Sequence, residues 1–166
     1  MTVRGIGYLA FFAVVASHLC LVRCSPEMIE QMGKGFSKAV AACQAELNLP
    51  EAVYNDMKNY WNLDYDLTNR DFGCLIVCLS KKLDLIDEEG KLHHGNAKDF
   101  AIEHGADEKV AQQVIDIVHG CEQQSAGGSD PCMVTLEIAK CFRAKIHDLK
   151  WAPSMEVLLD EVLAEI

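Results

Sequence analysis

Six cysteines after residue 40 have side chains that can form covalent cross-links. They follow the pattern C-x30-C-x3-C-x42-C-x10-C-x8-C, which begins at Cys43 and ends at Cys141. An even number of cysteines at defined spacing in a secreted chain is typical of a disulfide framework. The competing interpretation is a metal site. Disulfides are the better interpretation, because a secreted chain lies in an oxidising compartment. Six cysteines allow about 15 pairings, and the spacing alone does not choose among them.

Cys74 and Cys78 are separated by one helical turn. On a helix their side chains lie on the same face, so they are poorly placed to bond each other. We therefore expect each of them to reach a different segment, which ties three pieces of chain together.

The histidines are the second group of residues whose side chains are chemically reactive. His93 and His94 are adjacent beside the acidic segment 87–89, and His119 lies on a separate predicted helix. We considered a metal site, a solvated surface position and a pH switch. Adjacent histidines point in different directions and no cysteine is free to help, so we expect no metal. The pH switch is attractive because histidine has the unperturbed pKa nearest physiological pH.

The N-terminal segment predicts a secretory signal peptide over residues 1–24. Met1 to Arg4 is short and basic, and an apolar run from Ile6 to Val22 follows it. We place the cleavage after Cys24, which leaves residues 25–166 as one domain with six of the eight cysteines. A membrane anchor is the alternative, because the run is about as long as the shortest membrane spans.

The predicted mature chain is strongly acidic. The whole sequence has a net charge of −10, and the leader removes Arg4 and Arg23 but no acid, so the charge becomes −12. Such a chain repels phosphate backbones, and we expect no nucleic-acid partner.

Helix-starting and helix-ending residues recur along the mature chain, whereas no segment shows sustained alternation of β-branched residues. We therefore predict an all-α domain. Thr68-x-x-Asp71 resembles a capping box, and Gly105 is a predicted C-cap. The expected helices begin at Ser25-Pro26, Pro50, Phe72, Asp107 and Asp130-Pro131, and a short helix that follows the turn at 87–90 ends at Glu103-His104.

The cysteine spacing resembles the signature of insect odorant-binding proteins. Four segments are similar to the moth pheromone-binding branch of that family: Leu92–Asn96, His104–Asp107, Asp116–Cys121 and Trp151–Met155. The resemblance implies a compact bundle of about six helices around an apolar cavity. It also implies the disulfides Cys43–Cys78, Cys74–Cys132 and Cys121–Cys141.

Several residues acquire a binding role through this resemblance. By composition alone, the apolar side chains of the helices are ordinary core. The resemblance instead implies a cavity for a long-chain alcohol, acetate or aldehyde, lined by Phe36, Trp61, Ile76, Leu92, Val118 and Phe142. Ser80 is either a solvated helix serine or a hydroxyl that hydrogen-bonds the ligand oxygen. Tyr60 departs from the phenylalanine that the family tends to have.

We expect the C-terminal tail, 151–166, to be conformationally switchable. From Met155 to Ile166 it contains no basic residue and is amphipathic as a helix. Its carboxylates resist burial near neutral pH and become neutral in acid. The resemblance implies that the tail then enters the cavity and displaces ligand. It also implies that tail acids pair with histidines at neutral pH, which by position suggests His94 with Glu156 and His119 with Glu165. Asp160 departs from the small or apolar residue of related chains.

The predicted function is therefore a carrier rather than an enzyme, with no cofactor. It would bind a hydrophobic pheromone or odorant in antennal sensillar fluid and deliver it to an olfactory receptor or dendritic membrane. The resemblance allows a homodimer at neutral pH. A saposin-like lipid-binding protein is disfavoured by the x30 and x42 gaps. A secreted phospholipase is disfavoured because His147-Asp148 has no Gly-rich calcium loop beside it, and no G-x-S-x-G motif is present.

Overall fold

The structure is a computed structural model that describes residues 6–153, with side chains from Pro26 onward. Within this part the chain forms six helices and no strand, which confirms the all-α prediction. The helices are α1 (Ile6–Leu47), α2 (Glu51–Asn59), α3 (Arg70–Lys82), α4 (His94–Glu103), α5 (Glu108–Gln124) and α6 (Pro131–Asp148). The predicted amphipathic tail lies outside the described residues from position 154 onward.

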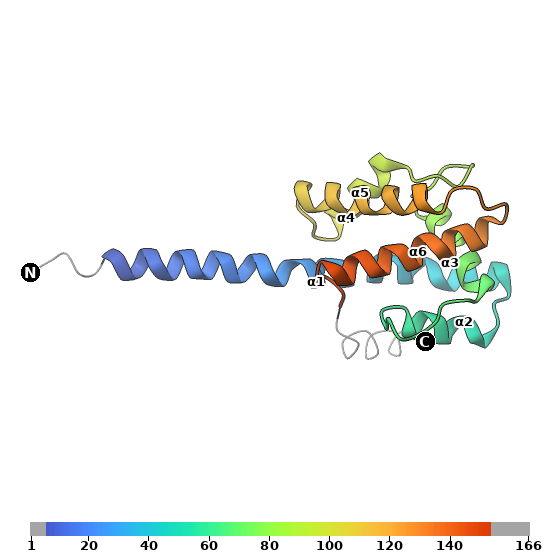
Figure 1. The fold of residues 1–166 in the computed structure, drawn as a ribbon, viewed down its shortest axis with the longest axis horizontal. Coiled ribbons are helices and arrows are strands. Elements are labelled where there is room, and N and C mark those ends of the chain that lie inside the picture. Colours follow the sequence, from blue (N-terminus) through green and yellow to red (C-terminus); the bar gives the residue numbers. More distant parts are fainter. Residues whose placement is uncertain (1–5, 154–166) are drawn as a thin grey trace, which may run out of the picture.

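Helix α3 contacts three of the other helices. It packs against α1, α2 and α6, while α5 packs against α4 and α6. In Figure 1, α4 and α5 lie above the plane of α1, α3 and α6, and α2 lies below it. The N-terminal part of α1 extends beyond the bundle. No helix in the described part of the chain is long and apolar enough to cross a membrane.

The predicted start of the first helix is wrong. Helix α1 does not begin at Ser25-Pro26 but runs unbroken from Ile6 to Leu47, with Pro26 inside it. Proline removes one backbone hydrogen bond and usually kinks or breaks a helix interior. Here the preceding segment is rich in leucine and alanine, which favour helix strongly, so helical structure is present on both sides of the proline.

Capping residues explain where most of the other helices begin. Asp107 accepts a hydrogen bond from the amide of Val110 (2.8 Å), and Asp130 accepts one from Cys132 (3.0 Å), as their sequence positions predict. The capping box at Thr68 is wrong. Asn69 is the N-cap of α3 and accepts from the amide of Asp71 at 3.0 Å. The asparagine adopts the extended backbone of a cap and is held there by Asp56 Oδ2, which lies 2.6 Å from its Nδ2.

Three disulfides connect four of the helices. They join Cys43 to Cys78, Cys74 to Cys132 and Cys121 to Cys141, the pairs that the family resemblance implies. Cys74 and Cys78 thus link α3 to α6 and to α1, so one helix is covalently tied to two others.

A glycine permits the close contact between α3 and α6. A Cβ atom built on Gly73 would collide with the backbone carbonyl oxygen of Cys132. Because that obstacle is backbone, it cannot rotate away as a flexible side chain would. Gly73 therefore sets the helix separation beside the Cys74–Cys132 disulfide.

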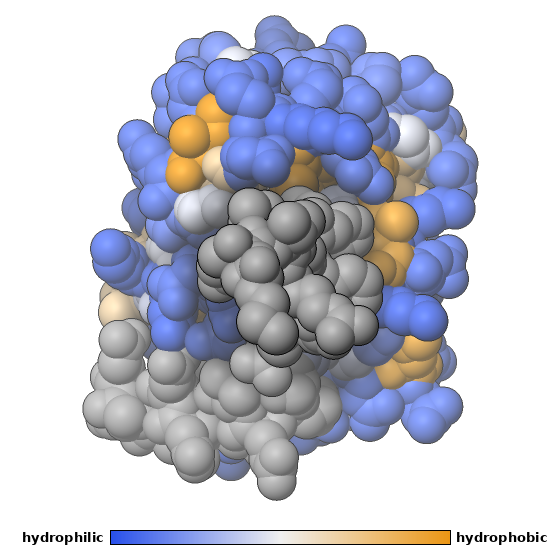
Figure 2. Space-filling view, turned by 90° about the vertical axis from the view of Figure 1, so that its left-hand side faces the viewer, coloured by the Kyte–Doolittle hydropathy of each residue, from blue (hydrophilic) through white to orange (hydrophobic). Residues whose placement is uncertain are grey.

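The buried apolar residues form three clusters rather than one continuous core. One cluster lies around Leu75 and Leu136, a second around Val114 and Ile146, and a third around Leu85. Partly buried residues such as Met32 and Phe36 pack against two of the clusters at once. The outer surface is mostly hydrophilic when viewed along α1, apart from small apolar patches (Figure 2). The interior is thus divided around a central space.

Candidate ligand-binding cavity

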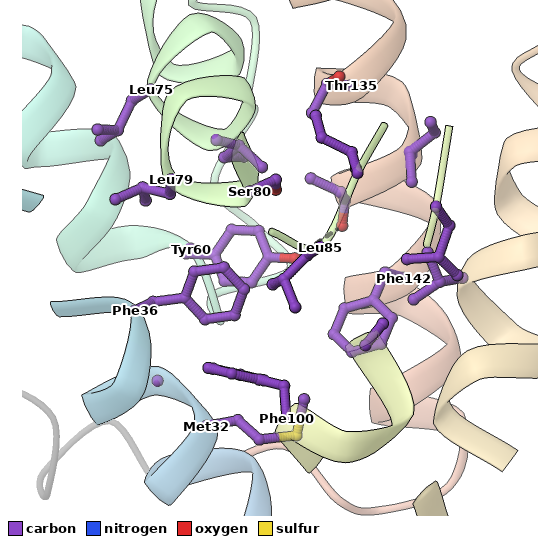
Figure 3. A pocket seen from close by; sticks show the side chains of 18 of the residues that line it. Met32, Phe36, Tyr60, Leu75, Leu79, Ser80, Leu85, Phe100, Thr135 and Phe142 are labelled. Atoms are coloured by element: carbon purple, nitrogen blue, oxygen red, sulfur yellow. Dashed lines mark hydrogen bonds between the residues drawn. The ribbon is translucent and has the colours of Figure 1, made fainter. Parts of the chain in front are cut away.

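A cavity of about 350 Å³ lies between the three apolar clusters. Its volume is within the range of roughly 300–1,000 Å³ that is common for small-molecule sites. All seven residues that the sequence analysis proposed as ligand contacts line it: Phe36, Trp61, Ile76, Ser80, Leu92, Val118 and Phe142. Figure 3 shows several of the lining side chains around the open centre.

Helical periodicity explains how three of the walls form. Helix α1 supplies Met32, Phe36 and Val40, which are four residues apart and so share one face. The contributions of α3 and α6 follow the same rule: Phe72, Leu75, Ile76, Leu79 and Ser80 from α3, and Thr135, Ile138, Ala139 and Phe142 from α6.

Aromatic rings make up much of the wall. The rings of Phe36 and Phe100 meet edge to face with centroids 5.3 Å apart, and those of Trp61 and Phe142 are 6.4 Å apart. Large rings offer broad apolar contact area with few rotatable bonds. This wall suits a flexible hydrocarbon chain.

Few polar groups face the cavity, and two of them already have partners. The Ser37 hydroxyl donates to the carbonyl of Lys34, and the Tyr60 hydroxyl donates to the carbonyl of Ala139. Ser80 is half-buried near the end of α3, and its hydroxyl makes no hydrogen bond within the described part of the chain. Its oxygen faces the open centre in Figure 3, so it can donate to or accept from a ligand.

Helix α6 fixes the turn that carries Tyr60 and Trp61. Buried Arg143 donates to the backbone carbonyls of Tyr60, Asn62 and Tyr65 at 3.0–3.2 Å. His147 Nε2 lies 2.8 Å from the carbonyl oxygen of Trp61. This function of α6 was not predicted from the sequence. The sequence contains a pattern that could have predicted it, because Ala139, Arg143 and His147 recur every four residues on one helical face.

The segment between α3 and α4 forms another part of the wall. Ile86 and Leu92 form an isolated antiparallel bridge, and both line the cavity. The amide of Leu92 donates to Glu122 Oε1 on α5 at 2.8 Å. Glu122 also borders the cavity. The segment between α3 and α4 is therefore held in place by a hydrogen bond to an ionisable side chain.

The structure separates the roles of the two adjacent histidines. His93 is the N-cap of α4, and its Nδ1 accepts from the amide of Asn96 at 3.2 Å. His94 instead faces His119, with ring centroids 5.0 Å apart. His119 Nδ1 in turn lies 3.5 Å from Glu122 Oε2. The spacing His119-x-x-Glu122 could have revealed this contact, because such residues share a helix face.

The partners that sequence position suggested for these histidines, Glu156 and Glu165, lie outside the described residues. The last described residues are well anchored. The amide of Trp151 donates to the carbonyl of Ile146 at 3.0 Å, and Pro153 is buried. Trp151 packs against the cluster that also contacts Trp61 and Phe142 of the cavity wall.

Comparison with known proteins finds a matching family and several similar proteins. Residues 19–145 match the PBP/GOBP family. The chain is 48% identical to pheromone-binding protein 2 of Epiphyas postvittana over 159 residues, which covers 95% of this chain and 96% of the relative. It is 32% identical to general odorant-binding protein 1 of Bombyx mori over 131 residues, or 79% of this chain and 80% of the relative.

A solved structure shows the same fold. The crystal structure of Epiphyas postvittana pheromone binding protein 3 is 56% identical in sequence and superposes with a TM-score of 0.64. The match covers 69% of this chain and 98% of that protein.

Proposed function

The chain belongs to the PBP/GOBP family, and on that premise we propose that it carries a long-chain pheromone or odorant and releases it in acid. Proteins of this family are binding proteins rather than enzymes, and they carry hydrophobic ligands. The proposal therefore concerns the class of ligand, the place of action and the way in which the ligand leaves.

The apolar cavity is the observation that carries the proposal. Burial of a methylene group contributes about 0.8 kcal/mol. A hydrocarbon chain of ten or more carbons thus supplies roughly 8 kcal/mol or more, the order of a micromolar dissociation constant. The free-energy cost of association reduces this sum. Each further methylene adds to the burial, so longer chains should bind better until the cavity is full.

The sparse polar groups support a ligand with one oxygen-bearing end. Alcohols, acetates and aldehydes all have this form. The Ser80 hydroxyl lines the cavity with no hydrogen-bond partner in the described part of the chain, so it is available both to donate and to accept. One neutral hydrogen bond contributes about 1 kcal/mol, so Ser80 orients the ligand more than it anchors it.

Release in acid is proposed from the tail sequence and its point of attachment. The tail beyond Pro153 contains Glu156, Asp160, Glu161 and Glu165 and no basic residue. Neutralising these carboxylates lowers the cost of placing the tail in an apolar space. Trp151, shortly before this segment, packs against the same buried cluster as Trp61 and Phe142, which border the cavity.

We place this activity outside the cell, in the sensillar fluid of the antenna, with delivery to a receptor or dendritic membrane. The N-terminal leader pattern supports secretion. All six cysteines after residue 40 are paired, which fits an oxidising compartment.

A displacement assay tests the proposal. A fluorescent apolar probe is bound to the protein and displaced by C10–C18 alcohols, aldehydes and acetates at pH 7 and pH 5. We expect micromolar displacement at pH 7 that strengthens with chain length, and weaker binding at pH 5. No displacement by any compound at pH 7 would refute the ligand class. Equal affinity at both pH values would refute acid release alone. Turnover of the acetates would instead show an esterase.

A further inference from the structure

We propose that His94, His119 and Glu122 form a binding site for a divalent transition-metal ion of the zinc class. The three side chains come from the first turn of α4 and the last two turns of α5. One ligand atom from each lies within 4.8 Å of the other two. The site lies at the edge of the cavity, which Glu122 also borders, and metal binding there goes beyond the proposed carrier function.

The geometry of the α5 pair matches that of a metal-bound pair. His119 Nδ1 and Glu122 Oε2 are 3.5 Å apart. Two ligands at 2.0–2.1 Å from a tetrahedral zinc ion are separated by roughly 3.4 Å. His94 is exposed and can rotate to complete three protein ligands, with water in the fourth position.

Tertiary structure removes the sequence argument against a metal. Adjacent histidines point in different directions, and this is true of His93 and His94. His93 turns back to cap α4, while His94 meets the ring of His119 on α5. The second imidazole thus comes from another helix, through the packing of α4 on α5.

Glu122 is held in position for this role. Its side chain is 20% exposed, and its Oε1 accepts the amide of Leu92, which leaves Oε2 directed toward His119. A carboxylate fixed by a backbone donor loses less freedom when it binds a metal, as is typical of ligands supported by outer-sphere hydrogen bonds.

Metal binding requires a proton change at His119. Its Nε2 lies 2.9 Å from Gln123 Nε2, which as oriented donates to it, so the ring proton is on Nδ1. Solvent would take up the Nδ1 proton and return one to Nε2, so the ring changes tautomer, stays neutral and binds the metal through Nδ1 with no net loss of a proton. The Nε2 hydrogen then donates to the Gln123 side chain, whose rotated amide offers its oxygen as acceptor. Imidazole and carboxylate ligands suit zinc, and the acidic chain favours cations.

Zinc competition with a chromophoric chelator tests the site, using the untagged, disulfide-bonded chain of residues 25–166, which lacks the leader cysteines Cys20 and Cys24. We expect one zinc ion per chain with micromolar or tighter affinity, and a cobalt complex with visible bands of four-coordinate geometry. His119→Gln, His94→Gln and Glu122→Gln should each weaken zinc binding at least tenfold. Glu122→Gln retains an oxygen that can accept from Leu92, so it tests the metal ligand without removing that hydrogen bond.

His93→Asn is the matched control, because asparagine is a good N-cap and the change also removes one imidazole. It should leave zinc affinity within twofold. Circular dichroism identifies variants that fail to fold, and the remaining variants then decide the outcome. Zinc affinity weaker than millimolar, or a loss in His93→Asn equal to that in His94→Gln, would overturn the proposal.

Discussion

The Tyr60 hydroxyl donates a hydrogen bond of 2.9 Å to the carbonyl oxygen of Ala139, which is 79 residues later in the chain. Burial raises the pKa of this phenol well above its usual range, so the hydroxyl keeps its proton. That proton is directed to α6 rather than to the cavity. A cavity ligand therefore meets Tyr60 mainly as a hydrogen-bond acceptor.

Tyr60→Phe should consequently change ligand preference. An alcohol can donate to the tyrosine oxygen, whereas an acetate or aldehyde cannot. Loss of one neutral hydrogen bond costs about 1 kcal/mol, so we expect alcohols to bind about three- to tenfold more weakly and acetates to change less. Displacement of a fluorescent probe by matched C12–C16 alcohols and acetates measures the ratio. An equal loss for both classes would contradict the acceptor role.

Ser80→Ala should weaken binding by less than tenfold. The apolar wall provides most of the binding energy, and the hydroxyl contributes one hydrogen bond of about 1 kcal/mol. The same displacement assay at pH 7 measures the change, with Ser125→Ala, at the C-cap of α5 outside the cavity lining, as the control. A loss above a hundredfold would mean that the hydroxyl anchors the ligand.

Truncation after Pro153 should preserve binding at pH 5. The shortened chain retains the Trp151 anchor and the complete cavity lining, but it lacks every acidic residue of the tail. Probe release is followed from pH 7 to pH 5 in both chains. If the truncated chain releases its ligand like the full chain, the tail is not the switch.

Gly73→Ala should destabilise the fold by about 1–3 kcal/mol, the usual cost of overpacking. The added methyl group would collide with the backbone of Cys132, so α3 and α6 must move apart beside their disulfide. Chemical denaturation without reductant measures the change in the free energy of unfolding.

Gly120→Ala on α5 is the matched control for that variant. A Cβ there meets nothing within 4 Å, and alanine favours helix over glycine. It should be neutral or stabilising. Equal destabilisation by the two variants would show that the effect of Gly73 is not steric.

The ion pair between Arg70 and Asp130 should make stability depend on pH in the acid range. Arg70 Nε donates to Asp130 Oδ2 at 2.6 Å, and this hydrogen bond lowers the pKa of the carboxyl. A lowered carboxyl pKa stabilises the fold above the unfolded value of about 3.9, and the contribution disappears as the pH falls through the folded value.

Arg70→Met tests this relation. We expect the variant to be less stable than the parent at pH 7, with a difference that shrinks below about pH 4. Urea denaturation at several pH values measures it, and Lys140→Met, which removes a separate exposed pair with Glu137, is the control. A difference that stays constant down to pH 2 would refute the assignment.

The sequence by itself determined most of the helices, and its resemblance to a known family implied much of the cavity wall. Asp107 and Asp130 mark helix starts through side-chain caps that depend on adjacent residues. The face of α3 that contains Ile76 and Ser80 follows from helical periodicity, which is also local. The cap at Asn69 and the extent of α1 were mispredicted because two local preferences competed at each point.

Contacts between distant segments were decided only by tertiary structure. The Tyr60–Ala139 bond, the three carbonyls bound by Arg143 and the meeting of His94 with His119 depend on how helices pack. Periodicity states which face a residue occupies, but not which face of another helix lies opposite. That choice follows from the disulfides and from close approaches such as the one at Gly73, which act across the whole chain.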